Sequence, residues 1–256
     1  MIYKEFTCTI KYTKYTNISE GKKLHMEKFD VIVVGAGTAG CLTAKTAAKA
    51  GLKVCLIDRK RSEDIGEKVC GDAIGKHHFD ALGLAYPKGE ELQNRIQGVK
   101  IHSPDMETVF EVKGERLYGF ILNRHSFGQR LLHDALDAGA TLLDSTIATD
   151  PILHNGFVTG VVAKNLKTEN KTQLQSKVVV DASGFTAVLR KKLPPETGID
   201  LNVHNEDVEA CYREIRSLAN VDIKSEFCEI YLDQTVSPGG YYWIFPEGEK
   251  RVNVGL

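Results

Sequence analysis

The chain has 256 residues, of which 42% are hydrophobic and 26% charged, as in folded globular proteins and unlike disordered, collagen-like or coiled-coil chains. Its formal net charge of −1 argues against a non-specific nucleic-acid binder, which needs a basic excess. The length allows one large domain or two small ones, and no apolar run approaches the roughly 18 residues that a membrane-spanning helix needs.

The cysteine pattern favours a reducing compartment. The six cysteines are Cys8, Cys41, Cys55, Cys70, Cys211 and Cys228. No two of them form the Cys-x-x-Cys pair that is typical of zinc ribbons and thioredoxin-like motifs. The first 24 residues are rich in lysine and threonine and lack the apolar segment of a signal peptide. We therefore expect reduced thiols and a cytosolic location.

Residues 1–27 are polar and carry no clear periodicity, and we take Met26 as the natural start. Two interpretations stay open for this segment. It is either a weakly ordered extension or, over Cys8–Tyr15, an edge strand favoured by β-branched residues.

A complete β-α-β unit follows. The apolar run Asp30–Val34 predicts a parallel strand that is buried on both faces. The small residues of Cys41–Ala50 predict a helix that ends at Gly51. Lys53–Ile57 predicts a second strand, with Asp58 directly after it.

The later elements are shorter and mostly strands, as judged from period-2 and period-3.6 patterns. We expect a loop at Arg59–Gly75, a helix at Lys76–Leu82, an antiparallel set at Ile96–His102, Thr108–Val112 and Tyr118–Leu122, and a helix at Arg124–Ala138 that ends at Gly139. Strands at Thr141–Ala148, Gly156–Lys164 and Gln173–Asp181 precede a short basic helix reaching Lys192. After a break at Pro194-Pro195, strands are expected around Glu226–Asp233, Tyr241–Phe245 and Arg251–Leu256.

The residues between the first strand and its helix form a G-x-G-x-x-G motif, Gly35 to Gly40, in the context that a dinucleotide fingerprint requires. Gly35 would permit the tight turn, Gly37 the approach of a pyrophosphate and Gly40 close packing of the helix on the strand. Asp58, 18 residues after Gly40, would accept hydrogen bonds from ribose hydroxyls. The plainer alternative is an incidental glycine turn, and the motif alone does not distinguish FAD from NAD.

Two further segments carry a family resemblance. Lys68-Val69-Cys70-Gly71-Asp72 and the P-x-x-Y-x-W-x-F-P stretch over 238–246 resemble signatures of the geranylgeranyl reductase family, which in archaea includes digeranylgeranylglycerophospholipid reductases. The turn of Val178–Gly184 and Arg124 at a helix start resemble FAD-containing oxidoreductases more broadly. The resemblance runs from about Phe29 to the last residue, with Thr38 where relatives usually carry proline.

The resemblance implies an α/β fold of the aromatic-hydroxylase-like branch. A glutathione-reductase-type, Rossmann-like FAD-binding domain would occupy 28–195 and a strand-rich, incomplete substrate domain 196–256, with the strands of 96–122 as candidates to join the substrate sheet. It also implies FAD contacts from a set of residues along both segments. These are Gly35, Gly37, Ala39, Gly40, Asp58, Cys70, Gly71, Ala73, Arg124, Ala148 and Asp181.

Three candidate features each have a plainer interpretation. Cys70 would be catalytic at the flavin, although most buried cysteines are inert small hydrophobes. Tyr241, Trp243 and Phe245 share one face of a strand, where they would line a substrate wall or pack a core. Arg124 would contact FAD or cap its helix. The pair His77-His78 predicts no metal site, because adjacent helical residues do not share a face and no ligand spacing completes a site.

We expect a flavoenzyme that saturates isolated C=C bonds of geranylgeranyl chains on an archaeal-type ether lipid, with ferredoxin or NAD(P)H as electron donor. Contact with the membrane surface would be transient and would follow from the insolubility of the lipid. The rivals are a group-A-type flavin monooxygenase that uses NAD(P)H and O₂, and a flavin electron-transfer protein of the quinone-oxidoreductase type. The cysteine loop and the aromatic strand argue against the first rival, and the lack of iron–sulfur cysteine spacing argues against the second.

The resemblance also implies a second FAD segment, a Gly-Asp-Ala turn leading into a helix, which the sequence after Phe245 lacks. We therefore expect the chain to be a fragment with weak FAD retention, in which Val252–Leu256 forms a strand that awaits its partner. The alternative is a naturally short relative that binds only a nucleotide.

Overall fold

The computed structural model describes residues 27–201, 203–219, 226–248 and 250–256. The expected extension or edge strand before residue 27 therefore lies outside the described residues. The chain forms two compact units, each built from two separate stretches. Unit 1 contains residues 27–65 and 129–201, and unit 2 contains residues 66–128 and the described part of 203–256.

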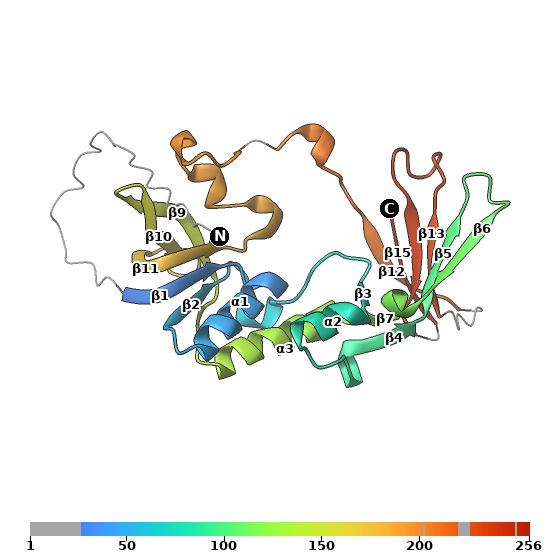
Figure 1. The fold of residues 1–256 in the computed structure, drawn as a ribbon, viewed down its shortest axis with the longest axis horizontal. Helices are drawn as coiled ribbons and strands as arrows, with labels where there is room; N and C mark the ends of the chain where they lie inside the picture. The colour runs from blue at the N-terminus through green and yellow to red at the C-terminus, as the bar shows by residue number, and fades with distance from the viewer. Residues whose placement is uncertain (1–26, 202, 220–225, 249) are drawn as a thin grey trace, which may run out of the picture. The chain divides into compact units, whose positions relative to one another are not determined.

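Unit 1 is built on a six-stranded sheet in the order β8-β2-β1-β11-β10-β9 (Figure 1). The strands are β1 (Glu27–Val34), β2 (Val54–Ile57), β8 (Thr141–Leu143), β9 (Thr146–His154), β10 (Phe157–Asn165) and β11 (Lys171–Asp181). The first four strands in the order are parallel, and β10 and β9 are antiparallel to their neighbours. Helix α1 (Thr38–Lys49) packs on β1 and β2, so the predicted β-α-β unit is confirmed.

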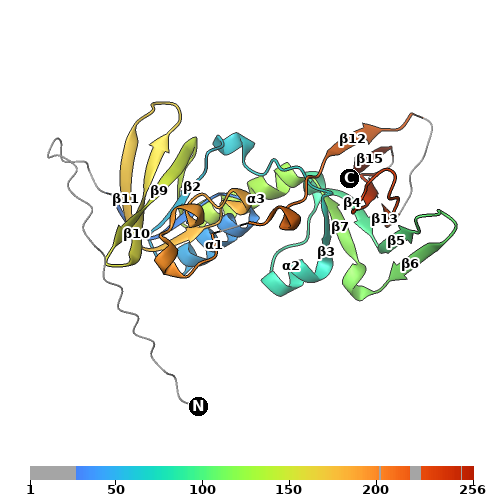
Figure 2. The same cartoon turned by 90° about the horizontal axis from the view of Figure 1, so that it is seen from above.

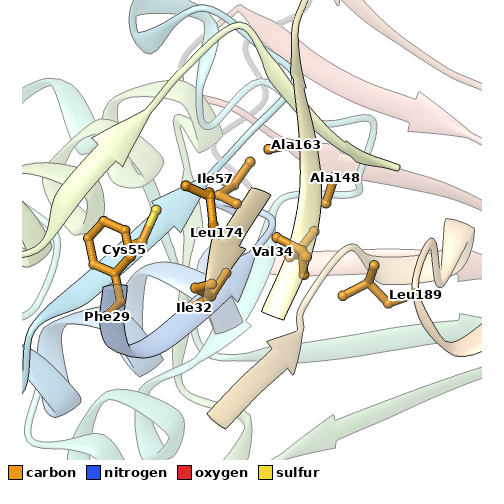
Figure 3. Close-up of a cluster of buried hydrophobic side chains, with 10 residues drawn as sticks. Phe29, Ile32, Val34, Cys55, Ile57, Ala148, Ala163, Leu174 and Leu189 are labelled. Carbon is orange, nitrogen blue, oxygen red and sulfur yellow. The ribbon is translucent and has the colours of Figure 1, made fainter. Parts of the chain in front are cut away.

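Apolar side chains from the central strands of this sheet form the core of unit 1 (Figure 3). Ile32 and Val34 of β1 are buried together with Ile57 of β2 and Leu174 of β11. Within the predicted run Asp30–Val34, residues 31–34 are buried, because β1 is a central strand of the sheet and α1 packs on it. The buried face of α1 consists of small residues, which lets the helix lie close to the sheet.

Unit 2 contains two sheets (Figure 2). The six-stranded sheet has the order β12-β15-β14-β13-β5-β6, and the three-stranded sheet has the order β3-β7-β4. The larger sheet consists of β5 (Gly98–His102), β6 (Val109–Lys113), β12 (Arg213–Ser217), β13 (Phe227–Tyr231), β14 (Tyr242–Pro246) and β15 (Arg251–Gly255). The smaller consists of β3 (Ala73–Gly75), β4 (Leu92–Ile96) and β7 (Gly119–Leu122).

Helix α2 (Lys76–Leu82) packs on the smaller sheet, and helix α3 (Arg124–Asp137) follows strand β7 in the chain. Helix α2 has the predicted bounds and buries Phe79, whose ring meets Phe120 and Phe127 edge-on. Helix α3 belongs to unit 2 up to Gly128 and to unit 1 from Gln129 onward. None of the helices that the structure describes is long and apolar enough to cross a membrane.

Several boundaries differ from those predicted. The segments at Ile96–His102, Thr108–Val112 and Tyr118–Leu122 do not form one antiparallel set, because only β5 and β6 pair, while β7 pairs with β3 and β4. The predicted strand Thr141–Ala148 is two strands, β8 and β9, separated at Ser145, whose φ of 46° breaks the extended backbone. In place of the basic helix reaching Lys192 the chain makes short 3₁₀ turns.

The division into units also differs from a boundary at residue 195. Strand β5 pairs in parallel with β13, so the strands of 96–113 join the sheet of the C-terminal stretch. Strand β15 lies between β12 and β14, and the expectation that it awaits a partner is wrong. The end of the expected loop Arg59–Gly75 forms strand β3, which pairs with β7, and strands β4 and β12 had no prediction of their own.

Candidate functional site

The glycine-rich loop of unit 1 connects β1 to α1. Gly35 has a φ of 103°, and its N–H donates to the carbonyl of Ile57 at 2.7 Å. A Cβ at Gly35 would overlap the carbonyl group of Ala182, and one at Gly40 would overlap the carbonyl oxygen of Gly35. Both glycines are therefore required by close backbone packing, as the fingerprint predicts.

Gly37 differs from these two glycines. A Cβ placed on it would meet no atom within 4 Å. The residue is exposed, as are Thr38 and Ala39, at the first turn of α1. No side chain caps this end of the helix and no acidic residue lies in its first turn. The free N–H groups and the helix dipole therefore make the loop suitable for a phosphate group.

Asp58 follows β2 and is tied to the same loop. Its Oδ2 accepts a hydrogen bond from the N–H of Ala36 at 2.6 Å, and its Oδ1 accepts one from the N–H of Lys60 at 2.8 Å. The carboxylate thus helps to fix the glycine loop. Each oxygen keeps a second lone pair for a ligand hydroxyl.

Asp181, at the end of β11, is occupied by its own turn. Its oxygens accept hydrogen bonds from the hydroxyl of Ser183 at 2.5 Å and from the N–H groups of Leu189 and Arg190 at 3.0 Å. Burial acts to raise the pKa of Asp181, but these hydrogen bonds outweigh burial and hold the pKa below its usual value. The geometry gives Asp181 a structural role, and a contact with FAD stays a prediction.

Ala148 does not lie at the end of its strand. It is an interior residue of β9, is paired with Ala163 of β10, and its side chain belongs to the unit 1 core shown in Figure 3. The predicted position was wrong because the strand was taken to end there, whereas β9 begins at Thr146 and continues to His154.

The second set of candidate residues lies in unit 2, where the Cys70 loop meets the aromatic strand. A Cβ on Gly71 would come within 2.9 Å of the ring of Phe245, so this ring lies directly on the loop backbone. The carbonyl of Cys70 accepts a hydrogen bond from Asn253 Nδ2 at 2.9 Å. Cys70 is half-buried, and Ala73 begins β3. Two segments that lie far apart in the sequence are thus brought together.

Tyr241, Trp243 and Phe245 form the predicted row. Their ring centroids lie 6.3 Å and 6.1 Å apart, and Tyr242, on the opposite face, stacks on Tyr231 with centroids 4.5 Å apart. Trp243 is only 7% exposed and Tyr241 is 48% exposed. Phe245 packs against the buried cluster of Ile96, Ile121 and Cys228. Trp243 and Phe245 therefore contribute to the core of unit 2, and a substrate contact stays a proposal.

Arg124, the first residue of α3, faces a carboxylate of the Cys70 loop. Its Nε lies 3.9 Å from Oδ1 of Asp72, and its guanidinium lies over the ring of Phe127. Arg213 of β12 approaches the other oxygen of Asp72 at 3.8 Å. Both distances exceed a hydrogen bond, so Asp72 lies between two positive charges without being directly bonded to either.

Asp72 itself was not among the predicted site residues. It is 4% exposed, has a φ of 65°, and its Oδ1 has no hydrogen-bond partner among the described residues. Burial raises its pKa to about 6, with Glu247 acting in the same direction and Arg213 and Arg124 against it. The sequence signal was an aspartate directly after a glycine in the resemblance motif.

Asn253 is the second functional candidate that sequence reasoning missed. It is fully buried in β15, where an amide interrupts apolar residues. It accepts a hydrogen bond from the indole N–H of Trp243 at 3.0 Å and donates one to Asp72 at 2.9 Å. A polar residue in the middle of an apolar strand was the available signal.

Among the residues that the structure describes, no three His, Cys, Asp or Glu side chains are arranged to hold a metal ion. His77 and His78 lie side by side, with ring centroids 3.9 Å apart.

Comparisons with known proteins identify relatives along the whole described chain. Two family matches meet end to end: Lycopene cyclase protein over residues 30–206 and Geranylgeranyl reductase catalytic domain over residues 207–256. A digeranylgeranylglycerophospholipid reductase of Sulfolobus acidocaldarius is 46% identical over 90% of this chain and 50% of its own length. That of Methanosarcina acetivorans is 35% identical over 89% of this chain and 54% of its own length.

Solved structures agree. A geranylgeranyl bacteriochlorophyll reductase-like protein from Thermoplasma acidophilum has a TM-score of 0.76 and 28% identity, covering 90% of this chain and 56% of its own. A probable FAD-dependent monooxygenase from Pseudomonas aeruginosa shares the fold, with a TM-score of 0.66 and 16% identity over 90% of this chain and 60% of its own. The chain spans about half the length of the curated relatives it matches. The chain belongs to the family described as lycopene cyclase protein, and its residues 207–256 match the geranylgeranyl reductase catalytic domain.

Proposed function

We propose that this chain carries out FAD-dependent reduction of isolated C=C bonds in geranylgeranyl chains of archaeal-type ether lipids. Its curated relatives are named digeranylgeranylglycerophospholipid reductases. The observation that carries the proposal is the junction in unit 2 between the Cys70 loop and the aromatic row. Gly71 and Asn253 join the two segments that resemble family signatures.

The glycine loop of unit 1 fits the ADP half of FAD. Gly37 leaves space where a side chain would block a ligand, and the uncapped start of α1 favours the negatively charged pyrophosphate. Asp58 stands at the end of β2, the position from which ribose hydroxyls are bound in dinucleotide folds. The orphaned Oδ1 of Asp72 in unit 2 is a further acceptor for a ligand hydrogen bond.

Reduced FAD, when bound, supplies a hydride to one alkene carbon, and a proton completes the new C–H bond at the other. The aromatic row gives unit 2 an apolar surface suited to an isoprenoid chain, and its ring faces can stabilise positive charge on an alkene carbon. Because Trp243 is covered, Tyr241 and the accessible part of Phe245 would make most of this contact. Cys70, half-buried beside Gly71, is the proposed catalytic residue.

The electron donor and the location are part of the proposal. The chain has a single glycine-rich nucleotide motif, so reducing equivalents would come from ferredoxin or from transiently bound NAD(P)H. We propose a cytosolic protein that contacts the membrane surface transiently while it takes up its lipid substrate.

Anaerobic incubation with FAD, dithionite and a geranylgeranyl lipid, followed by mass spectrometry, tests the proposed function. We expect a gain of two hydrogens for each double bond reduced. Cys70→Ser should retain FAD but lower the rate at least about tenfold, or roughly 1.4 kcal/mol. Cys211→Ser is the matched control, because this thiol is exposed. A gain of oxygen under air with NAD(P)H would instead identify a monooxygenase.

A further inference from the structure

A single buried amide joins the Cys70 loop to the aromatic row. The indole N–H of Trp243 donates to Asn253 Oδ1 at 3.0 Å. Asn253 Nδ2 donates to the carbonyl oxygen of Cys70 and to Oδ2 of Asp72, both at 2.9 Å. The side chain of Asn253 is fully buried, so these bonds have no competition from water.

The chemistry of the partners fixes the direction of every bond. An indole N–H can only donate, so it must face the amide oxygen of Asn253. A backbone carbonyl can only accept, so that of Cys70 must face the amide nitrogen. The amide therefore cannot rotate by 180° without losing its contacts. An asparagine is needed here because the position must accept from one neighbour and donate to two others.

The charge on Asp72 affects the strength of the hydrogen bond that it accepts from Asn253. The charged groups that face it are Arg124 from α3, Arg213 from β12 and Glu247 after β14. Burial affects the pKa of Asp72 more than any of these charges does and raises it to about 6. The charge of Asp72 therefore changes close to neutral pH. An ionised Oδ2 is a stronger acceptor for the amide N–H than a protonated one, because charge-assisted hydrogen bonds are roughly twice as strong as neutral ones.

We propose that Asn253 is a positioning residue that holds the Cys70 loop against the indole of Trp243, and that the charge on Asp72 controls how tightly it does so. In this arrangement the proposed catalytic loop and the aromatic row share one hydrogen-bonded amide, and they loosen together when Asp72 is protonated. This inference deepens the proposed function, on which its relevance to catalysis rests. Its test needs neither flavin nor lipid, so its failure is distinguishable from failure of the proposed function.

The test follows the indole proton of the ¹⁵N-labelled 256-residue chain. Trp243 is the only tryptophan, so its N–H gives one resonance. Between pH 4.5 and pH 8 we expect this resonance to shift with a midpoint near 6, and we expect the shift to disappear in Asp72→Asn. Asparagine tolerates the positive φ of position 72, which makes this variant compatible with the backbone.

Two control variants separate Asp72 from two other ionisable side chains of unit 2. His102 lies on the same sheet, with its ring stacked on Tyr231, and Glu247 is a second buried carboxylic acid. The indole shift should persist in His102→Gln and in Glu247→Gln. A resonance that stays constant across the pH range, or one that still titrates in Asp72→Asn, overturns the proposal.

A second measurement follows the loop. Asn253→Leu keeps a similar side-chain size but can neither accept from the indole nor donate to the carbonyl of Cys70. We expect labelling of Cys70 by a maleimide at pH 7 to accelerate at least about fivefold, with the exposed Cys211 as internal reference. An unchanged ratio of the two labelling rates would contradict the positioning role. If this variant does not fold, the titration of the native chain decides alone.

Discussion

Gly255→Ala tests how closely Trp243 packs on the backbone of β15. A Cβ at position 255 would lie 2.5 Å from Cη2 of the indole, closer still to Cζ2, and 2.6 Å from the carbonyl oxygen of Tyr212. That carbonyl accepts the N–H of Leu256 at 3.0 Å and is held in the sheet. The indole must therefore move, and its hydrogen bond to Asn253 is lost.

The expected loss of stability follows from these two effects. Overpacking of this kind costs about 1–3 kcal/mol, and a buried indole N–H without a partner costs about 1–3 kcal/mol more. The alanine recovers about 0.4–1 kcal/mol by restricting the unfolded chain. We expect a net loss of about 1–5 kcal/mol in the free energy of unfolding of unit 2.

Urea unfolding followed by the fluorescence of Trp243 measures this loss, because the only tryptophan of the chain lies in unit 2. At a typical urea dependence of about 2 kcal/mol per M, the midpoint should fall by at least about 0.5 M. Gly37→Ala is the matched control, since its new methyl group meets nothing within 4 Å. A midpoint within about 0.3 M of the native value would refute the close packing of the indole on β15.

The remaining predictions concern the cofactor, the thiols and pH. Gly37→Ala should leave thermal unfolding unchanged but weaken FAD binding at least about tenfold in a fluorescence titration, because the methyl group occupies the phosphate approach; equal affinity would contradict this role. Iodoacetamide at pH 8 should modify the accessible Cys70 and Cys211 before the three buried cysteines, Cys41, Cys55 and Cys228. Burial raises the pKa of each of these three thiols to about 12, and peptide mass spectrometry measures the order of modification. The hydrogen bond from Asn253 favours the ionised form of Asp72, but burial outweighs it and raises the pKa, so the folded state binds the proton more tightly and stability should fall as pH rises from about 4 to 6, by up to roughly 3 kcal/mol. Asp72→Asn should remove this dependence in unfolding experiments at several pH values, and an unaltered pH profile would exclude Asp72 as its source.

Elements that depend on neighbouring residues could be predicted from the sequence. The pairing of strands that lie far apart in the chain could not. The strand, glycine loop and helix from Asp30 to Ala50 were recognisable because each depends on neighbouring residues. Helix α2 had the predicted bounds for the same reason. Periodicity identified β7 as a strand but assigned it the wrong neighbours, since alternation shows which face is buried and not which strand lies beside it.

The candidate site shows the same limit. The motifs drew attention to Cys70 and Trp243, and the row of aromatics on one strand face was correct. The hydrogen bonds from Asn253 to Cys70 and Asp72 could not be predicted. They form only in the folded chain, where β15 pairs with β14. Buried polar residues in apolar segments are the sequence signal that such links leave behind.

The order of strands in unit 2 has a consequence for how the chain is made. Strand β5 emerges from the ribosome long before its parallel partner β13, and β12 must wait for β15, which inserts between it and β14. The larger sheet therefore cannot close until β15 (Arg251–Gly255) has been synthesised. The edge of β5 is open to other chains until β13 is made, and that of β12 until β15 is made, so nascent protein should depend on chaperones and low temperature for a good yield.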